Sequence, residues 1–151
     1  MENNKKVLVA FSGGLDTSFC VKYLKEDKGY EVHTALVNTG GFPASELDTV
    51  TEKALALGAV SHKNIDITQE FYEKAVRYMI FGNVLRGNTY PISVSSERVF
   101  QAIAIISYAK EIGAKAVAHG PVFLPGESQG QRSLVGCRLW GRTELDTTEA
   151  T

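Results

Sequence analysis

Cysteine is scarce in this 151-residue chain, which carries only Cys20 and Cys137, far apart in the sequence. Two such cysteines argue against a disulfide framework and against a zinc site. No apolar run approaches the roughly 20 residues that a membrane span needs, and the polar start, MENNKK, has no signal-peptide pattern. The net charge of −1 gives no long-range field that would attract nucleic acid or an anionic membrane. We therefore expect a soluble, cytoplasmic protein whose partners include neither nucleic acid nor a membrane.

What the chain does have, up to about residue 120, is a regular alternation of apolar runs and amphipathic segments. Strands are predicted at 6–11, 31–38, 62–67 and 114–120, and helices at 19–27, 45–57, about 69–85 and 96–112. This order predicts βαβ units and hence an α/β fold, an open, doubly wound parallel sheet with helices on both faces. Ligands of such sheets bind beyond the carboxyl ends of the strands, near the point where the strand order reverses.

The predicted helices carry local signals at their ends. A glycine (Gly29, Gly58 or Gly113) separates each of three helices from the strand that follows. Ser45 is a predicted N-cap because an acid follows three residues later. The helix at 69–85 is expected to be interrupted near Gly82, and the helix at 96–112 is apolar on nearly all sides, which predicts a buried helix.

Residues 121–151 have a different character. They contain no lysine, isoleucine or tyrosine, and they show no sustained period of 2 or 3.6 residues. We therefore divide the chain into a domain at 1–120 and an atypical C-terminal tail at 121–151. The tail is expected either to be a loosely ordered extension or to be an ending foreign to this fold, such as one read out of frame.

The stretch SGGLDTS, Ser12–Ser18, joins the first predicted strand to the first helix. One interpretation is a tight turn in which Asp16 is the N-cap of the helix. The other is a phosphate cradle, because Gly13 and Gly14 let successive backbone N–H groups converge on an anion at a helix N-terminus. Three hydroxyl side chains around the glycines favour the cradle. Asp16 would then help to hold a magnesium ion that bridges phosphates.

SGGLDTS resembles the pyrophosphate-binding loop of the ATP pyrophosphatase (PP-loop) superfamily, whose fold is adenine nucleotide α-hydrolase-like and Rossmann-like. Its DTS ending is similar to the form seen in the argininosuccinate synthase family. The resemblance implies ATP and Mg²⁺ as ligands, and it assigns no catalytic side chain, because positioning and charge neutralisation carry the rate. It implies that the following residues bind ATP: Ala10, Phe11, Ser12, Gly13, Gly14, Leu15, Asp16, Thr17, Ser18, Val37 and Gly120.

Residues 87–105 resemble the citrulline-binding region of the same family, in which a tyrosine is followed five residues later by a serine and then by an arginine. Tyr90, Ser95 and Arg98 match this pattern. The resemblance implies that Tyr90 and Ser95 contact citrulline, with Arg98 as a further candidate. The residue types alone also allow Ser95 to be a helix N-cap and Tyr90 to be a core aromatic.

Two further segments resemble parts of the family's ATP site. AKAVAHG, at 114–120, is similar to a strand and turn that reach the nucleotide, where Gly120 would allow close approach of the backbone. His119 is a candidate ligand or a structural residue. Val37 takes the place where the family's backbone lines the adenine pocket, and residues 38–40 (Asn38, Thr39 and Gly40) are predicted to form a loop over the site.

The resemblance implies a ligase that forms a C–N bond: ATP adenylates citrulline, and aspartate then displaces AMP to give argininosuccinate in arginine biosynthesis. It also implies a homo-oligomer in the family. After Gly120, however, PVFLPGESQGQR stands where the family has its aspartate-binding stretch, so the aspartate ligands have no match. We therefore expect the chain to correspond to the N-terminal, ATP-binding part of such an enzyme.

Two other functions stay open at this point. One is a different PP-loop synthetase, such as a tRNA-thiolating or amidotransferase-coupled enzyme. The near-neutral charge argues against tRNA, and Cys20 is more simply explained by helix packing than by reactivity. The other is a nucleotide-binding module without turnover.

Overall fold

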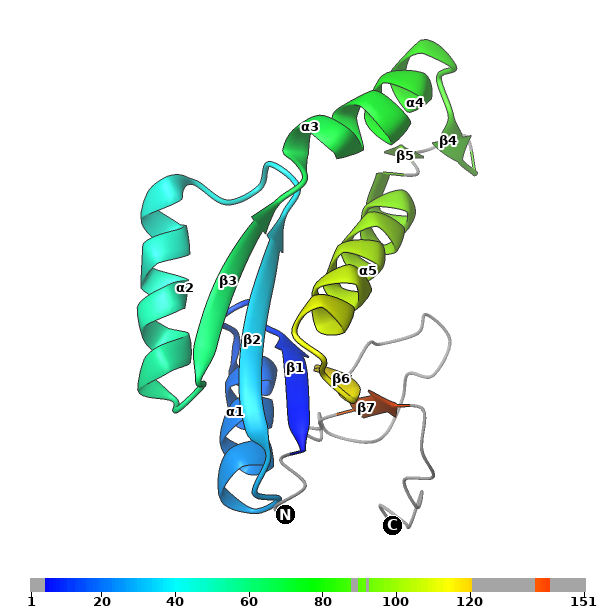
Figure 1. The fold of residues 1–151 in the computed structure, drawn as a ribbon. Helices are drawn as coiled ribbons and strands as arrows, with labels where there is room; N and C mark the ends of the chain where they lie inside the picture. Colours follow the sequence, from blue (N-terminus) through cyan, green and yellow to red (C-terminus); the bar gives the residue numbers. More distant parts are fainter. Residues whose placement is uncertain (1–4, 88–89, 92, 121–137, 142–151) are drawn as a thin grey trace, which may run out of the picture.

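The computed structural model of the chain describes residues 5–87, 90–91, 93–120 and 138–141, and it places a β-sheet between helices (Figure 1). In chain order the elements are β1 (Lys6–Ala10), α1 (Leu15–Glu26), β2 (Glu31–Asn38), α2 (Ala44–Ala56), β3 (Ser61–Asp66), α3 (Thr68–Phe71), the π-helical segment η1 (Tyr72–Val76), α4 (Arg77–Phe81), β4 (Leu85–Arg86), β5 (Tyr90–Pro91), α5 (Ser93–Glu111), β6 (Ala116–His119) and β7 (Arg138–Gly141). The predicted alternation and the α/β class are confirmed.

The main sheet has the strand order β3-β2-β1-β6-β7. Its first four strands are parallel, because β1 pairs with β2 and β6 and β2 pairs with β3, as predicted. β7 pairs antiparallel with β6, and Ala118 lies opposite Leu139. No strand is predicted at 138–141, because the few apolar residues there are too short a run to show a period. This pairing covers the N–H and C=O groups on one edge of β6.

The predicted division of the chain into a domain at 1–120 and a tail at 121–151 stays a prediction.

The strand order reverses at β1. β2 and β3 lie on one side of β1, whereas β6 lies on its other side. The connections that leave β1 and enter β6 therefore run on opposite faces of the sheet, which opens a crevice beyond the carboxyl ends of these two strands. The loop after Ala10 begins at this crevice, and His119 ends β6 beside it.

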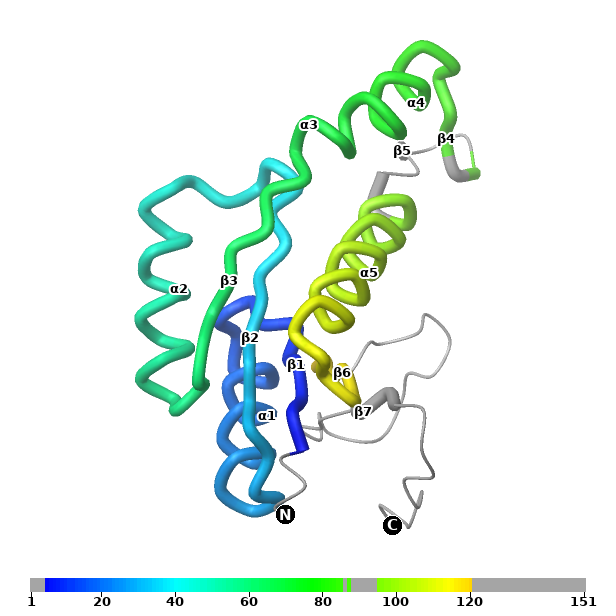
Figure 2. Tube along the Cα trace, viewed as in Figure 1, coloured from blue at the N-terminus to red at the C-terminus, as the bar shows by residue number. Residues whose placement is uncertain are grey.

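Apolar side chains form one core on each face of the sheet. Val7 and Val9 pack with Cys20 and its neighbours in the core under α1 and α2. Leu8 packs with Ile105 in the core under α5. Figures 1 and 2 show α1 and α2 on one side of the sheet and α5 on the other. Because helices cover both faces, β1 is apolar at every inner position instead of alternating with polar residues.

The helix ends follow the predicted glycines but not the predicted N-caps. Positive φ angles at Gly29, Gly58 and Gly113 confirm the three glycine junctions. Neither Asp16 nor Ser45 is an N-cap, because the N-caps of α1 and α2 lie two residues earlier, at the extended residues Gly14 (ψ 171°) and Pro43 (ψ 155°). Proline suits this place because its fixed φ matches the −69° observed at Pro43, and because it has no N–H to leave unpaired at the start of the helix.

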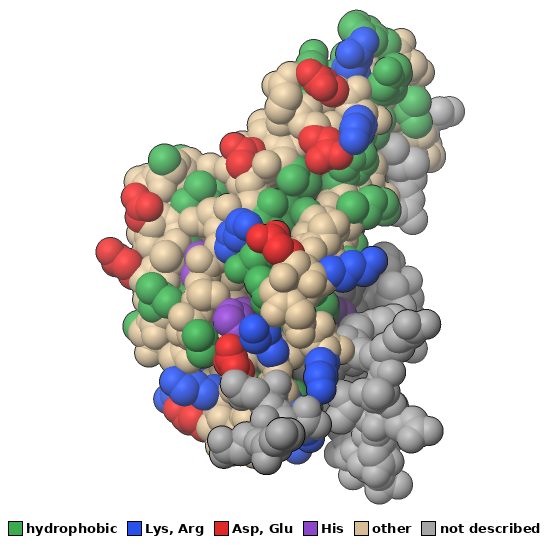
Figure 3. All heavy atoms as spheres, viewed as in Figure 1, with side chains coloured by type: hydrophobic (Ala, Val, Ile, Leu, Met, Phe, Trp, Pro, Cys, Tyr) green, Lys and Arg blue, Asp and Glu red, His purple; other side chains and the backbone are tan. Residues whose placement is uncertain are grey.

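A continuous helical segment formed by α3, η1 and α4 extends away from the sheet. It ends at Phe81, just before Gly82, so the predicted interruption becomes the end of the helix and Leu85 lies in β4. Asn83 takes a positive φ of 45° immediately after it, which stops the helical path. Figure 3 shows hydrophobic side chains gathered over α4, where Ile80 and Phe81 are 65% and 79% exposed.

The prediction that the helix at 96–112 is buried on nearly all sides is wrong. Ile105 and Ala109 of α5 are buried against the sheet, whereas Val99, Ile103 and Ile106 are about half exposed. A helix that rests on a sheet buries only one stripe of its surface unless other elements cover it. No helix within the described part of the chain is long and apolar enough to cross a membrane.

Candidate functional site

The loop between β1 and α1 leads the chain from a buried strand into a helix whose first turn has no side-chain cap. Gly13 takes a φ of +77°, and Gly14 is the extended N-cap residue, with no side-chain hydrogen bond capping α1. The first four N–H groups of a helix have no partner within the helix, and the helix dipole places partial positive charge there. An uncapped helix start at the crevice is therefore a suitable place for an anion.

Two of the three hydroxyls predicted to favour a phosphate are used inside the loop. Thr17 Oγ1 and Ser18 Oγ donate to the Gly14 carbonyl at 3.2 and 2.7 Å. The Ser18 backbone N–H donates to the same oxygen at 3.0 Å, which closes the first turn of α1. The side chain of Ser12 is exposed. A bound phosphate would thus meet backbone N–H groups and Ser12 first, and would have to compete with a carbonyl for the other two hydroxyls.

Gly13 and Gly14 differ in how strictly the backbone requires glycine. A Cβ at Gly13 would sit at positive φ and 3.3 Å from Val50 Cγ2, on α2. A Cβ at Gly14 would meet only Ser12 Oγ, at 3.6 Å, and the φ of −72° there suits any residue. The fold itself therefore explains Gly13, whereas it leaves Gly14 unexplained. Apart from the preference of N-cap positions for glycine over residues such as valine, access to the loop is the remaining reason for a glycine at Gly14.

Gly13→Ala is expected to destabilise the chain by about 1–2 kcal/mol, because a strained backbone and a crowded Cβ combine at this position. Thermal unfolding followed by circular dichroism should show a midpoint lower by about 2–8 °C. An unchanged midpoint would mean that the loop is not held in the positive-φ conformation described above.

A hollow of about 220 Å³ lies beside the loop, at the carboxyl ends of β1 and β2. Four residues predicted to bind ATP line it together: Ala10, Phe11, Ser12 and Val37. Phe42, Gln101 and Ile105 complete much of its wall. The walls are mainly apolar, with the Gln101 amide as a polar group, and such a lining suits a flat base.

Val37 lies in the part of β2 that extends beyond the end of β1. The pairing of the two strands ends at Ala10 opposite Ala35, and the Phe11 N–H still donates to the Ala35 carbonyl at 2.8 Å. Successive residues of a strand direct their backbone groups to alternate sides, so Val37 turns its N–H and C=O to the same side as Ala35. On that side β1 has already turned away into the loop, so these groups face the hollow.

A hydrogen-bonded chain that the sequence did not reveal ties α5 to the loop after β2. Thr39 Oγ1 donates to Glu97 Oε1 at 2.5 Å, and Gln101 Nε2 donates to the same oxygen at 3.1 Å. The spacing of Glu97 and Gln101 by four residues could have suggested a pair on one helix face. Nothing in the sequence connects either residue to Thr39, which is 58 positions from Glu97.

The predicted loop over the site at residues 38–40 follows β2. Asn38 is buried, and its Oδ1 accepts the N–H groups of Gly40 and Phe42 at 2.9 and 3.3 Å. This is the local pattern by which asparagine shapes a turn with its own side chain. The turn carries Phe42 to the wall of the hollow.

The end of β6 approaches the first turn of α1. A Cβ on Gly120 would lie 3.3 Å from Asp16 Cβ and 3.6 Å from Thr17 Cγ2, so the backbone at Gly120 lies close to the first turn of α1. The approach of Gly120 to a nucleotide stays a prediction. His119 Nδ1 lies 2.5 Å from the Gly120 carbonyl oxygen, and Cys20, buried in the core, directs its thiol to the His119 carbonyl at 4.0 Å. The structure thus brings Gly120 and His119 beside the loop.

Two of the three predicted citrulline residues, Ser95 and Arg98, lie near the start of α5. Ser95 falls inside the first turn of α5, which begins at Ser93, so the alternative prediction that Ser95 is the N-cap is wrong. Ser95 and Arg98 are exposed, and neither lines the hollow. Tyr90 lies in β5, and its side chain is outside the described part of the structure. The Thr39–Glu97 contact links this end of α5 to the carboxyl end of β2.

Among the described residues, no three His, Cys, Asp or Glu side chains come together as a metal site. Asp16, half buried in the first turn of α1, is the acidic residue of the loop. One carboxylate is a poor site by itself, but it suits Mg²⁺ that arrives bound mainly by phosphates and water.

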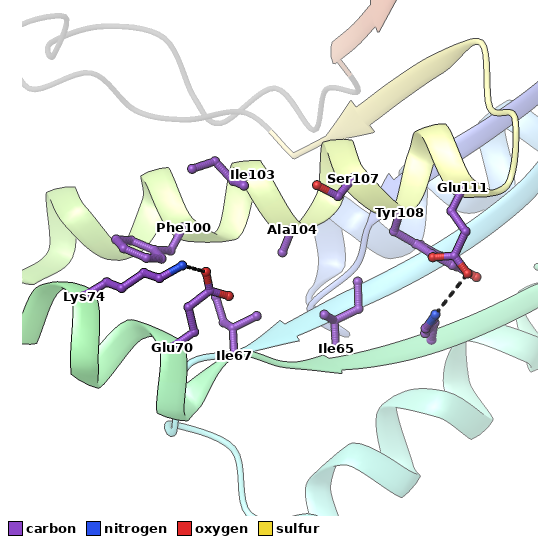
Figure 4. A pocket seen from close by; sticks show the side chains of 11 residues that line it. Ile65, Ile67, Glu70, Lys74, Phe100, Ile103, Ala104, Ser107, Tyr108 and Glu111 are labelled. Atoms are coloured by element: carbon purple, nitrogen blue, oxygen red, sulfur yellow. Dashed lines mark hydrogen bonds and ion pairs between the residues drawn. The ribbon is translucent and has the colours of Figure 1, made fainter.

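A larger groove of about 590 Å³ lies between β3, α3 and α5, on the other flank of α5 (Figure 4). Its middle is apolar, with Ile65 and Phe100 among its residues, and ion pairs stand at both ends, Lys74–Glu70 and Lys63–Glu111. None of the predicted site residues lines it. Size alone therefore does not locate the site, and the smaller hollow at the strand-order reversal is the better candidate.

Comparison with known proteins places the chain beside one family. The family described as arginosuccinate synthase N-terminal HUP domain matches residues 6–129. Argininosuccinate synthase of Xylella fastidiosa is 40% identical over 118 residues, covering 78% of this chain and 29% of that protein. The protein of the same name from Pyrobaculum aerophilum is 32% identical over 155 residues, covering 95% of this chain and 38% of that protein.

The chain thus spans about a third of the length of these curated relatives. Among solved structures, the NMN synthetase of Francisella tularensis has a TM-score of 0.56 at 15% identity, over 76% of this chain and 44% of that one. At this identity the likeness concerns the fold alone.

Proposed function

Because this chain belongs to the argininosuccinate synthase family, we propose that it binds ATP at the loop after β1 and supplies the nucleotide site for joining citrulline to aspartate. The observation that carries the proposal is the meeting of two features at the strand-order reversal. An uncapped helix start with Gly14 at its N-cap lies beside a hollow lined by Ala10, Phe11, Ser12 and Val37. The first suits the pyrophosphate end of ATP, and the second suits the base.

In the proposed reaction the ureido oxygen of citrulline attacks the α-phosphorus of ATP, and the bond to the β-phosphate oxygen breaks. Citrullyl-AMP and pyrophosphate are formed. The amine of aspartate then attacks the ureido carbon, AMP leaves with the C–O bonding electrons, and the amine loses its proton to solvent. The loop N–H groups stabilise the charge that grows on the departing pyrophosphate. Mg²⁺ would neutralise phosphate charge, with Asp16 as the loop carboxylate that could help to hold it.

Tyr90, Ser95 and Arg98 are the proposed citrulline contacts. Ser95 and Arg98 are supported by their place near the start of α5, which the Thr39–Glu97 hydrogen bond ties to the carboxyl end of β2. The role of Tyr90, in β5, rests on the resemblance of the motif alone. The residues that follow Gly120, where an aspartate site would be expected, lie outside the described residues. We place the activity in the cytoplasm, in keeping with the composition of the chain.

A second candidate function is a nucleotide-binding module without turnover. It is favoured by PVFLPGESQGQR after Gly120, which leaves the family's aspartate-binding residues without a match. A different PP-loop synthetase is less well supported. The NMN synthetase of Francisella tularensis shares the fold at only 15% identity, whereas the argininosuccinate synthase of Xylella fastidiosa is 40% identical.

Calorimetry and a pyrophosphate-release assay on the purified 151-residue chain separate these functions. We expect Mg-ATP to bind with a dissociation constant of about 0.1–1 mM, at the weak end of enzyme–substrate affinities. We expect no pyrophosphate release with citrulline and aspartate from this chain alone, since no aspartate-binding residues are matched. Absence of ATP binding would contradict the proposal. Release that requires both amino acids would eliminate the module and make the chain itself a synthase.

A further inference from the structure

Lys53, which no sequence pattern singled out, reaches the loop from α2. Its Nζ donates a hydrogen bond to the Gly13 carbonyl, 40 residues away in the sequence. Val50, one helical turn earlier, is the side chain that a Cβ at Gly13 would meet. α2 therefore packs its middle and last turn against the Gly-Gly stretch. A lysine in the last turn of a helix usually interacts with the negative end of the helix dipole. Lys53 lies in the last turn of α2, but its Nζ is directed to the loop between β1 and α1 instead.

The bond sets the direction of one peptide group. The Gly13 carbonyl and the Gly14 N–H belong to the same peptide unit, and the described chain contains no cis peptide bond. In a planar trans peptide the C=O and N–H groups point in opposite directions. With its carbonyl held toward Lys53, this unit directs the Gly14 N–H away from α2. Gly14 is the N-cap, so this N–H is the first of the donors available at the start of α1.

A Gly-Gly peptide is also the unit of the loop that turns over most easily, because neither residue has a Cβ to oppose it. Turned over, it would present a carbonyl oxygen to a phosphate and withdraw a donor. The loop has no cation of its own to offset this, since Asp16 is the single charged residue in Ser12–Ser18. An ammonium on the carbonyl also polarises the peptide and strengthens its N–H as a donor.

We propose that Lys53 is a positioning residue for the pyrophosphate end of ATP: it holds the Gly13–Gly14 peptide with its N–H available to the phosphates. This inference rests on the proposed function of the loop. It predicts that Lys53 matters for ligands that carry a pyrophosphate group and is nearly irrelevant for AMP, which lacks one.

The test compares three ligands on four forms of the full chain. Mg-ATP, pyrophosphate and AMP are titrated by calorimetry into the wild type, Lys53→Met, Lys53→Arg and the control Lys74→Met. Lys74 is an exposed lysine of η1 whose Nζ pairs with Glu70, so its replacement removes the same charge far from the loop. Thermal unfolding of every variant reports on the fold.

Lys53→Met is expected to weaken ATP and pyrophosphate binding about tenfold, about 1.4 kcal/mol. AMP binding should change by less than about twofold, and the unfolding midpoint by less than about 2 °C, because Lys53 is exposed. Lys53→Arg, which keeps a charged donor, should recover affinity to within about threefold of wild type. Lys74→Met should bind all three ligands as the wild type does.

Equal ATP affinity in Lys53→Met and the wild type would overturn this inference while leaving the proposed function intact. So would an equal loss for AMP, which would indicate a general structural role. A wild-type chain that binds neither ATP nor pyrophosphate would instead contradict the proposed function, and this inference with it.

Discussion

Gly14→Val is expected to abolish measurable ATP binding and to leave the chain folded. The valine side chain would stand over the backbone donors at the start of α1, where the phosphates are proposed to lie. We expect the affinity to fall at least about thirtyfold, about 2 kcal/mol. The cost to stability should not exceed about 1 kcal/mol, because the backbone at Gly14 is extended and only Ser12 Oγ comes near. Calorimetry with Mg-ATP and thermal unfolding measure the two effects separately.

Gly13→Ala is the matched comparison for this variant. Substitution of Gly13 is expected to lower stability, because its φ of +77° and the nearby Val50 require glycine. Substitution of Gly14, where neither reason applies, is expected to lower ATP affinity instead. If Gly14→Val bound ATP as tightly as the wild type, the loop would be a simple strand-to-helix turn. If it unfolded, the local geometry described for Gly14 would be incorrect.

Phe11→Ala is expected to give the largest loss of stability among the substitutions considered, about 3–5 kcal/mol. Phe11 is 2% exposed and is among the largest fully buried side chains. Its ring and the His62 ring form a T-shaped pair with centroids 6.0 Å apart, and Phe11 also lines the hollow. Since domains of this size are stable by about 5–15 kcal/mol, the variant should unfold at clearly lower denaturant concentration.

Phe81→Ala is the control for this substitution, because it removes the same atoms from a ring that is 79% exposed on α4. Its unfolding free energy should stay within about 0.5 kcal/mol of the wild type. Urea unfolding followed by circular dichroism measures both. A loss below about 1 kcal/mol for Phe11→Ala would show that the ring is not packed as described.

Much of the sheet could be predicted from the sequence, because its inner strands are buried on both faces. The inner part of β1 is a continuous apolar run, β2 is buried along nearly all of its length, and a positive-φ glycine follows the end of α1, α2 and α5 within three residues. These signals are local, so a single sequence contains them.

The caps and the burial of the helices were harder to predict. The caps depend on competition between neighbouring residues, and the burial depends on packing partners that are distant in the sequence. Asp16, Thr17 and Ser18 are residues that favour caps and turns, yet they lie within the first turn of α1, where Gly14 is the cap. The apolar middle of α5 predicts burial, but burial also requires a second covering element, which no property of the helix itself can reveal. The π-helical segment Tyr72–Val76 has no signal in the sequence that we recognise.

The candidate site divides in the same way. The loop and Val37 were predicted because their motif resembles a known family, and the structure gathers Ala10, Phe11, Ser12 and Val37 at one hollow. Lys53, Glu97 and Gln101 were missed, because each acts across the fold on a partner or surface that sequence spacing does not indicate.

The strand order has a consequence for how this site comes into being during folding. β1 pairs with β6 through Val7 and Ala116, a separation of 116 − 7 = 109 residues. Closing so long a loop carries an entropic penalty that local helices do not repay, so such pairings form slowly. Gly120 reaches the loop only when β6 is in place, while the loop and α2 can meet earlier. The loop and its backbone donors can therefore form before Gly120 packs against Asp16 and Thr17, so this contact should be among the later parts of the site to form during refolding.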